Sequence, residues 1–287
     1  MKVASNKTAD IIRYVRKCLK DVYPEEEIAS FIFILFESYC KLNKTGLLSG
    51  KREYINESEL LLIYNAVKEL EHHKPIQYIT GTTWFYGLEF IVEPAVLIPR
   101  PETEELVEII IKENKNNGSQ KILDIGTGSG CIAVSLKKYL PFAEISAMEV
   151  AQEALEIARG NSEKNNSDIH FIHADILNEK QWGKKKYDII VSNPPYVKES
   201  EKKMMSKNIL DYEPAQALFV SDTNPLIFYN AIFSFSSRQK NKTKIYLEIN
   251  ESMAEELIAL ANTYNISEIN IVKDIHGKNR FFICELS

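Results

Sequence analysis

Cysteine is scarce in this sequence, and the few cysteines are not spaced as metal ligands. The 287 residues include four, none of them in a CxxC motif. Structural zinc sites and the disulfide frameworks of small secreted proteins need clustered cysteines. We therefore expect no metal site and no disulfide framework, and interpret the four as small buried side chains. They are Cys18, Cys40, Cys131 and Cys284.

Long hydrophobic runs are also missing. The most apolar stretch, Ile28–Phe36, contains Ser30 and is followed by Glu37. A membrane-spanning helix needs about 20 predominantly apolar residues. The first residues are polar and basic, without the apolar core of a secretory signal. We predict a cytoplasmic protein with no membrane partner.

Positive charge is not in excess. The formal net charge is -5 and the isoelectric point is about 5.7. Proteins that bind nucleic acid by neutralising phosphates usually present a basic surface. We expect a protein or small-molecule partner and no direct binding of nucleic acid.

The first part of the chain, residues 1–74, has the pattern of a small all-helical domain. Apolar residues recur at helical spacing over Ile11–Leu19 and again over Glu57–His72. Between them a second helix is expected to begin near Pro24, whose fixed φ suits a first helical turn. The polar segment Lys41–Arg52 contains two glycines and is predicted to be a loop.

Residues 75–99 differ in character from the helical part. They are rich in aromatic and β-branched residues, and Gly81 and Gly87 divide them. This pattern predicts a β-hairpin linking two domains.

Residues 100–287 alternate short apolar runs with amphipathic segments of helical length. This alternation predicts an α/β domain with a mostly parallel sheet and helices on both faces. The last two runs, Ile269–Lys273 and Arg280–Glu285, are separated by Gly277 and predict two adjacent antiparallel strands. The other predicted strands are Lys121–Ile125, Glu144–Glu149, Ile169–Ala174, Tyr187–Ser192 and Lys244–Ile249.

A glycine-rich loop follows the first of these strands and opens a helix. Its glycines have the order GxGxG, and Cys131 stands where a dinucleotide-binding loop would have its last glycine. An acid before the loop would repel a pyrophosphate but attract a cationic ligand. S-adenosylmethionine carries an ammonium and a sulfonium, so the loop predicts that cofactor. The residues expected to bind it here are Asp124, Gly126, Thr127, Gly128 and Gly130.

Two further acids end the next two strands. Glu149 lies at the tip of the second strand, where a carboxylate accepts hydrogen bonds from ribose hydroxyls. Asp175 ends the third strand and is expected to accept from the adenine amino group. Both are predicted to bind the cofactor.

The fourth strand ends in the tetrapeptide Asn193-Pro194-Pro195-Tyr196, which we predict to be catalytic. Ligands of open α/β sheets bind beyond the carboxyl ends of strands, so Asn193 should lie beside the cofactor and the substrate. A planar amide or amino nitrogen is a poor nucleophile. The Asn193 oxygen and the Pro194 carbonyl could hold its two N–H groups and direct its lone pair to the methyl group. Tyr196 is expected to pack against the planar group.

These residues together resemble the amino- and amide-nitrogen methyltransferases, which include N6-adenine and N2-guanine enzymes. Three further stretches are similar to the HemK/PrmC family of protein-(glutamine-N5) methyltransferases, which act on peptide chain release factors. They are Pro75–Gly81, Ile98–Val107 and Glu213–Leu218.

The resemblance implies a Rossmann-like class I methyltransferase fold with a seven-stranded sheet. It also implies a substrate, the glutamine of the Gly-Gly-Gln loop of release factors, held by Asn193 and Pro194. The helical domain and the hairpin would dock this partner. Arg100 and Glu102 would lie near the substrate, with an interdomain salt bridge or a helix cap as their alternative role. Glu213 would order the loop after the tetrapeptide.

Two positions depart from the family pattern. Asn250 stands where glycine usually follows the fifth strand, and Glu149 stands where aspartate is common. Asparagine tolerates a left-handed φ better than most residues, so the turn can survive. The longer arm of glutamate should still reach the ribose.

Three other functions stay open at this stage. The nearest is an N6-adenine or N2-guanine methyltransferase of RNA or DNA, which shares the tetrapeptide but is disfavoured by the acidic composition. A NAD-dependent oxidoreductase is disfavoured by Cys131 and Asp124. A binding-only module is disfavoured by the intact tetrapeptide. We expect a monomer.

Overall fold

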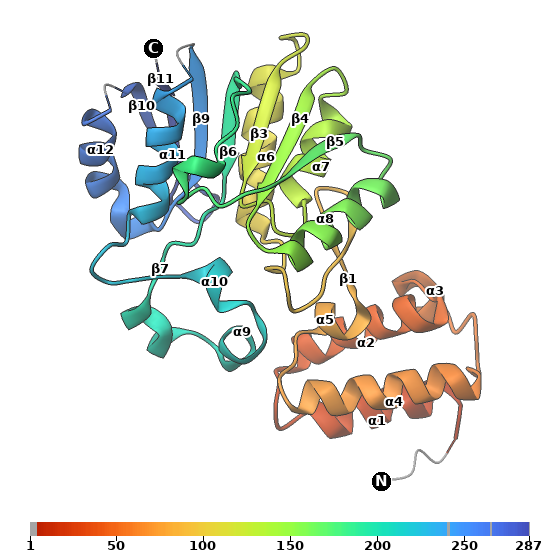
Figure 1. Ribbon diagram of the computed structural model, residues 1–287. Helices are drawn as coiled ribbons and strands as arrows, with labels where there is room; N and C mark the ends of the chain where they lie inside the picture. The colour runs from red at the N-terminus through yellow and green to blue at the C-terminus, as the bar shows by residue number, and fades with distance from the viewer. Residues whose placement is uncertain (1–4, 240–241, 265, 287) are drawn as a thin grey trace. The chain divides into compact units, whose positions relative to one another are not determined.

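Two units make up the chain, and each is described by itself. The computed structural model describes residues 5–239, 242–264 and 266–286 (Figure 1). The first unit comprises Met1–Gly81 together with Ser206–Tyr212. The second comprises Thr82–Met205 and Glu213–Ser287.

The first unit is helical, with a hydrophobic core of its own. Its longest helices each bury an apolar stripe, seen in Ile11, Leu35 and Val67, which are fully buried. Asn56 caps one of them by accepting a hydrogen bond from the Glu59 backbone N–H at 2.8 Å. The helices are α1 (Thr8–Leu19), α2 (Glu25–Cys40), α3 (Lys44–Leu48), α4 (Glu57–Glu71), α5 (Ile76–Thr80) and α9 (Lys207–Tyr212).

The prediction of an uninterrupted loop over Lys41–Arg52 is wrong, because α3 forms inside it. Asn43 accepts a hydrogen bond from the Gly46 N–H at 2.9 Å and so starts this short helix. Leu47 is buried in the core of the unit. A five-residue helix has too little periodicity to be distinguished from a polar loop in the sequence.

The predicted hairpin is present in the second unit but is shorter than the predicted segment 75–99, since Ile76–Thr80 forms α5 in the first unit. Strands β1 (Thr82–Phe85) and β2 (Leu88–Ile91) pair antiparallel across Tyr86 and Gly87, which both have positive φ. Phe85 and the neighbouring strand's Phe90 are buried in the core beneath α6 and α7. The hairpin is therefore anchored by its own aromatic side chains.

A seven-stranded sheet forms the centre of the second unit. Its order is β10-β11-β9-β6-β3-β4-β5, and β11 runs antiparallel to both neighbours, as the sequence predicts. The five strands β9, β6, β3, β4 and β5 run parallel to one another. The strands are β3 (Lys121–Ile125), β4 (Glu144–Glu149), β5 (Ile169–His173), β6 (Ile189–Ser192), β9 (Thr243–Glu248), β10 (Ile266–Lys273) and β11 (Asn279–Leu286).

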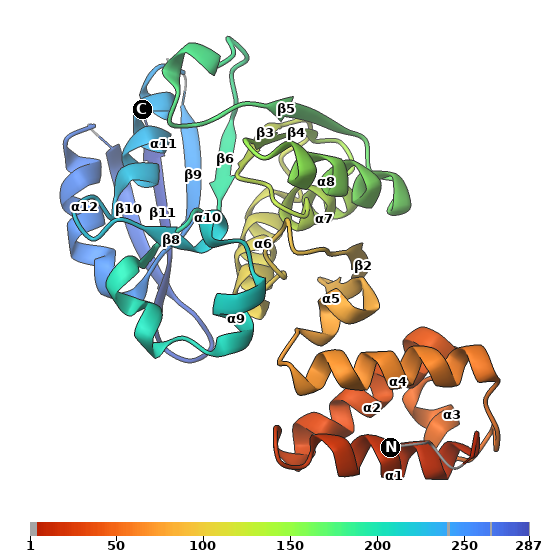
Figure 2. The same ribbon diagram turned by 60° about the horizontal axis from the view of Figure 1, so that its bottom comes forward.

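Helices cover both faces of this sheet (Figures 1 and 2). In β3, Ile122 packs in a cluster with α6 and α7, whereas the next residue, Leu123, packs in a cluster with α11 and α12. Because both faces are buried, the central strand β6 is apolar from Ile189 to Val191, with no alternation in burial. The helices are α6 (Pro101–Asn114), α7 (Cys131–Tyr139), α8 (Gln152–Lys164), α11 (Ile227–Ser237) and α12 (Ala254–Asn262).

Short elements follow the tetrapeptide. Strands β7 (Val197–Lys198) and β8 (Phe219–Val220) form a small parallel pair, and α10 (Ala215–Leu218) precedes β8. Short 3₁₀ helices occur after the tetrapeptide at Glu199–Met204 and Glu251–Met253, and before it at Glu179–Gln181. Within the residues that the structure describes, no helix is both long enough and apolar enough to span a membrane.

Candidate active site

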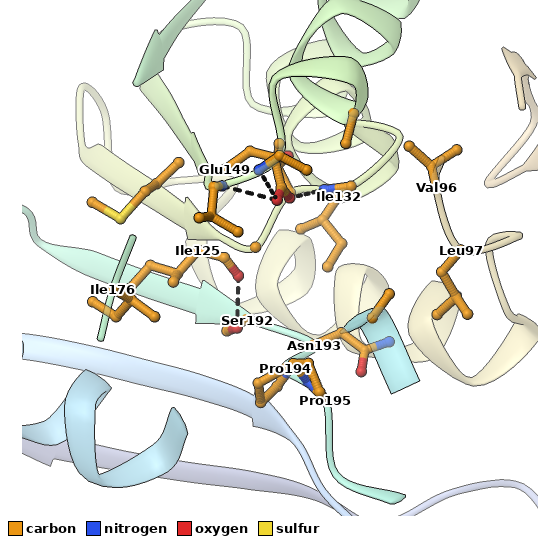
Figure 3. A pocket seen from close by; sticks show the side chains of 18 of the residues that line it. Val96, Leu97, Ile125, Ile132, Glu149, Ile176, Ser192, Asn193, Pro194 and Pro195 are labelled. Carbon is orange, nitrogen blue, oxygen red and sulfur yellow. Dashed lines mark hydrogen bonds between the residues drawn. The ribbon is translucent and has the colours of Figure 1, made fainter. Parts of the chain in front are cut away.

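A cavity of about 270 Å³ opens at the carboxyl ends of the parallel strands (Figure 3). In the sheet, β4 and β5 lie on one side of β3, whereas β6 and β9 lie on its other side. The strand order therefore reverses at β3. Ligands of open α/β sheets bind at such a reversal of strand order. Here Ser192 at the tip of β6 donates a hydrogen bond to the Ile125 carbonyl at 2.7 Å, which ties the two strand ends together.

The glycine loop forms one wall of the cavity. Gly126, Gly128 and Gly130 have φ of 70°, 54° and 80°, a left-handed region that favours glycine. The Gly126 and Thr127 amides donate to the Met148 carbonyl at 2.9 and 3.1 Å, which folds the loop against β4. Gly126, Thr127 and Gly128 line the cavity. Gly130 lies behind them at the start of α7.

Asp124 lies under this loop and is fully buried, away from the cavity wall. Its Oδ2 accepts a hydrogen bond from the Thr127 hydroxyl at 2.6 Å. Burial raises the pKa of Asp124 to about 7, against the hydrogen bonds from the Thr127 hydroxyl and the Ala133 backbone. The structure thus places this acid where it supports the loop, rather than in direct contact with the cavity.

Glu149 does line the cavity, at the tip of β4. Its Oε2 accepts from the Gly128 N–H at 2.9 Å, and its Oε1 accepts from Val150 and Ala151 at 2.9 and 3.1 Å (Figure 3). A carboxylate has about four acceptor positions, so one is left for a ligand. These amides hold the side chain at the position that the sequence predicted for a ribose-binding acid.

The third predicted acid, Asp175, also lines the cavity. Its Oδ1 accepts from the Leu177 N–H at 2.8 Å. Apolar residues stand near it, and sequence reasoning missed them because they are ordinary core-type side chains. The cavity-lining residues of this kind include Met148, Ala154, Ile176, Phe228 and Ile232.

The first three residues of the tetrapeptide form the opposite wall. Asn193, Pro194 and Pro195 line the cavity. The Asn193 side-chain NH₂ donates to the Thr103 hydroxyl at 3.1 Å. Neither proline carries an N–H, so this turn offers its backbone carbonyls as acceptors.

Tyr196 has a different position from the one expected. Its hydroxyl donates to Glu248 Oε1 at 2.9 Å, and it packs on the core beside α11 rather than lining the cavity. Burial raises the pKa of Tyr196 well above its usual value, and the charge of Glu248 adds to this effect. The buried Glu248 carboxylate thus fixes the Tyr196 hydroxyl, and the packing of Tyr196 against the substrate stays a prediction.

Arg100 and Glu213 form a close ion pair at the edge of the cavity. Arg100 Nη2 lies 2.6 and 2.7 Å from the two Glu213 carboxylate oxygens, and the Glu213 side chain is buried. Arg100 also lines the cavity. Glu102 lies in the first turn of α6 outside the cavity wall. Arg100 and Glu213 both belong to the second unit, so this salt bridge is not the interdomain one of the alternative role, and the Arg100 side chain makes no cap hydrogen bond to α6.

Two polar residues close to the site escaped the sequence reasoning. Thr103 and Glu248 are buried, and the Thr103 hydroxyl donates to Glu248 Oε2 at 2.7 Å. Two sequence features could have pointed to them: Thr103 lies inside the Ile98–Val107 stretch, and Glu248 lies at the tip of a predicted strand. Their contact could not be predicted from positions so far apart in the chain.

The cavity has the chemistry that S-adenosylmethionine requires. Acceptor carboxylates from Glu149 and Asp175 line it alongside the apolar side chains of Met148 and Ile176. A nucleoside needs this combination, because its hydroxyls and amino group donate while its base is flat and apolar. In the described residues, no group of three or more potential metal ligands comes together.

Comparison with known proteins places this chain among methyltransferases. Residues 102–220 match the methyltransferase small domain, and residues 10–81 match the PrmC N-terminal domain. The chain is 44% identical to a release factor glutamine methyltransferase of Flavobacterium psychrophilum, covering 92% of this chain and 94% of that protein. It is 40% identical to one of Bacteroides thetaiotaomicron, covering 94% and 97%.

Solved structures share the fold at low sequence identity. The hMettl16 catalytic domain, in complex with MAT2A 3′UTR hairpin 6, superposes with a TM-score of 0.55 at 17% identity and covers 93% of this chain and 94% of that one. A methyltransferase from Pyrococcus furiosus gives 0.50 at 20% identity, with coverages of 77% and 97%. The predicted Rossmann-like class I methyltransferase fold is confirmed.

Proposed function

This chain belongs to the release factor glutamine methyltransferase family, and we propose that it methylates the N5 side-chain amide of the glutamine in the Gly-Gly-Gln loop of peptide chain release factors, which modulates translation termination. The observation that carries the proposal is the 44% identity across 94% of a relative of that name. The position of the Asn193 amide at the cavity supports it.

S-adenosylmethionine is the methyl donor, and we assign its site to the cavity. The glycine loop Gly126–Gly130 would carry the amino acid part. Glu149 would accept from the ribose and Asp175 from the adenine amino group, with Ile176 against the base. Asp124 would act through Thr127, by holding the loop in shape.

The acceptors around the tetrapeptide supply the catalysis. When bound, S-adenosylmethionine provides an electrophilic methyl group on a sulfonium. The Asn193 Oδ1 and the Pro194 carbonyl would accept the two N–H groups of the glutamine amide, which orients its lone pair. Both acceptors stabilise the positive charge that grows on nitrogen, so no strong base is required before methyl transfer. The extra proton is lost afterwards.

We also propose how the rest of the chain serves the reaction. The helical domain over residues 1–74 and the hairpin segment 75–99 would dock the release factor, and residues 100–287 would carry out methyl transfer. Arg100, held by Glu213, would lie at the substrate side of the cavity together with Glu102 from the adjoining helix turn. The enzyme would act as a monomer in the cytoplasm, where release factors work.

A methyl-transfer assay tests this function. The protein is incubated with methyl-labelled S-adenosylmethionine and, separately, a release factor, the same factor with its loop glutamine changed to alanine, and total RNA. Asn193→Ala is run alongside each reaction. We expect label only on the intact factor, and a loss of roughly a hundredfold or more with Asn193→Ala, as when a polar transition-state contact is removed. Label on RNA alone would contradict the release-factor assignment.

A further inference from the structure

The Asn193 amide is the outer end of a buried chain of hydrogen bonds. Its NH₂ donates to Thr103 Oγ1 at 3.1 Å, and Thr103 Oγ1 donates to Glu248 Oε2 at 2.7 Å. The three residues come from the end of β6, the first turn of α6 and the tip of β9. Thr103 and Glu248 are 2% and 1% exposed, so water does not compete for the bond between them, whereas the bond to Asn193 is partly buried at the cavity.

The direction of the chain follows from its inner end. An ionised carboxylate can only accept hydrogen bonds. Glu248 therefore takes the single hydroxyl proton of Thr103, and the Thr103 oxygen has only lone pairs left for its other neighbour. A lone pair attracts the NH₂ of Asn193 and repels its carbonyl oxygen. The amide is thereby fixed with Oδ1 as the atom left over for a ligand.

We propose that Thr103 and Glu248 are positioning residues that set the orientation of the Asn193 amide for catalysis. The inference rests on the proposed function, because the orientation matters only if Asn193 must accept from a substrate N–H. With the amide turned by 180°, its NH₂ would face the NH₂ of the glutamine, donor against donor. The chain thus selects substrates that present N–H groups.

The same carboxylate also anchors the far end of the tetrapeptide. Tyr196 donates to Glu248 Oε1 at 2.9 Å, so Asn193 and Tyr196 are tied to a single group, the former through Thr103. Burial raises the pKa of Glu248, while the hydrogen bonds from Thr103 and Tyr196 and the charge of Arg280 favour its ionised form. In this arrangement both Glu248 oxygens accept, Oε2 from Thr103 and Oε1 from Tyr196.

Variants of Thr103 test the proposal. Thr103→Val keeps the shape but removes the hydroxyl, Thr103→Ala removes the hydroxyl and leaves room for water, and Thr103→Ser keeps the hydroxyl. A matched control is Thr243→Val, which removes another buried hydroxyl that donates to the Tyr187 carbonyl at 3.0 Å, at the far end of the same strand as Glu248. For each protein, kcat and KM for the release factor, the Kd for S-adenosylmethionine and the melting temperature are measured.

We expect kcat to fall at least roughly tenfold in Thr103→Val and Thr103→Ala, the size of one lost hydrogen bond, with cofactor affinity retained and KM changed less than kcat. Thr103→Ser should restore kcat. Thr243→Val should lower the melting temperature while kcat stays at the wild-type value. Wild-type kcat in both Thr103→Val and Thr103→Ala would overturn the inference while leaving the proposed function standing. An equal loss of kcat in Thr243→Val would also overturn it.

A second measurement does not depend on activity. The side-chain NH₂ signals of Asn193 are identified in the ¹⁵N spectrum by their loss in Asn193→Ala. We expect slow exchange with solvent in the wild type and in Thr103→Ser, and faster exchange in Thr103→Val and Thr103→Ala. Equally fast exchange in the wild type would overturn the proposed orientation, even if the wild type fails to methylate a release factor and the proposed function is wrong.

Discussion

At the scale of single residues, two acids near the glycine loop differ in burial, and this decides what each can do. Glu149 keeps its carboxylate at the cavity wall, where three backbone amides compensate the charge. Asp124 is fully buried with one hydroxyl donor, and burial raises its pKa to about 7. Glu149 is therefore suited to contact a ligand, whereas Asp124 is suited to shape the loop.

Asp124→Asn should flatten the pH dependence of stability. The folded protein keeps a proton on Asp124 up to about pH 7, whereas the unfolded chain loses it near the ordinary value of 3.8. Stability is thus lost as the pH rises through this window, by at most about 4 kcal/mol for a shift of this size. Denaturant unfolding between pH 4 and 7 without cofactor measures it. If the unfolding free energies of the wild type and Asp124→Asn change with pH by the same amount, the raised pKa of Asp124 is contradicted.

At the scale of elements, the turn from β3 to α7 is the most constrained part of the site. Gly130, the N-cap residue just before α7, has φ of 80°, and a Cβ there would lie 3.2 Å from the Ala158 Cβ and 3.3 Å from its Cα. The glycine thus permits close packing of α7 on α8. It also keeps the loop above it at the cavity wall.

Gly130→Ala should therefore lower the free energy of unfolding by more than the strain of placing alanine at a left-handed φ. Gly277→Ala is the matched control, since Gly277 has φ of 79° and open space around it. We expect the control to lose about 1 kcal/mol and Gly130→Ala about 1–3 kcal/mol more through overpacking. Gly130→Ala should also weaken S-adenosylmethionine binding, measured by calorimetry. Equal unfolding free energies for the two variants would refute this role of the Ala158 contact.

Elements were predictable from the sequence where a periodic pattern extends over several residues. The strand Glu144–Glu149 has the predicted bounds, and its residues from Ile145 to Glu149 are buried on both faces of the sheet. The fifth strand ends at Glu248, one residue before the predicted end. The partners of Asn193 and Tyr196 were not predictable, since Thr103 and Glu248 meet them only through tertiary folding. The same holds for the burial of Asp124.

At the scale of the whole molecule, the chain forms two units, and each has its own hydrophobic core. All residues that line the cavity belong to the second unit, and the helical unit has a separate hydrophobic core. Identity with relatives extends through both, over 92% of this chain. This division agrees with the proposal that one unit binds the cofactor while the other recognises the partner.

Hydrogen exchange should report the two units separately. Adding S-adenosylmethionine should slow exchange of the backbone amides from Gly126 to Gly130 and around Glu149, because a bound ligand stabilises the segments that it contacts. Amides of α1 and α4 should be unchanged by the cofactor and slowed only by a release factor. Mass spectrometry of the exchanged peptides measures this. Protection of α1 or α4 by the cofactor alone would contradict the assignment.

The central claim is that a glutamine amide nitrogen receives the methyl group, and fragmentation mass spectrometry of a treated release factor tests it most directly. The account predicts one added methyl group on the side chain of the Gly-Gly-Gln glutamine with the wild-type enzyme, and none with Asn193→Ala. A methyl group on another residue, or an unmodified glutamine beside methylated RNA, would contradict it.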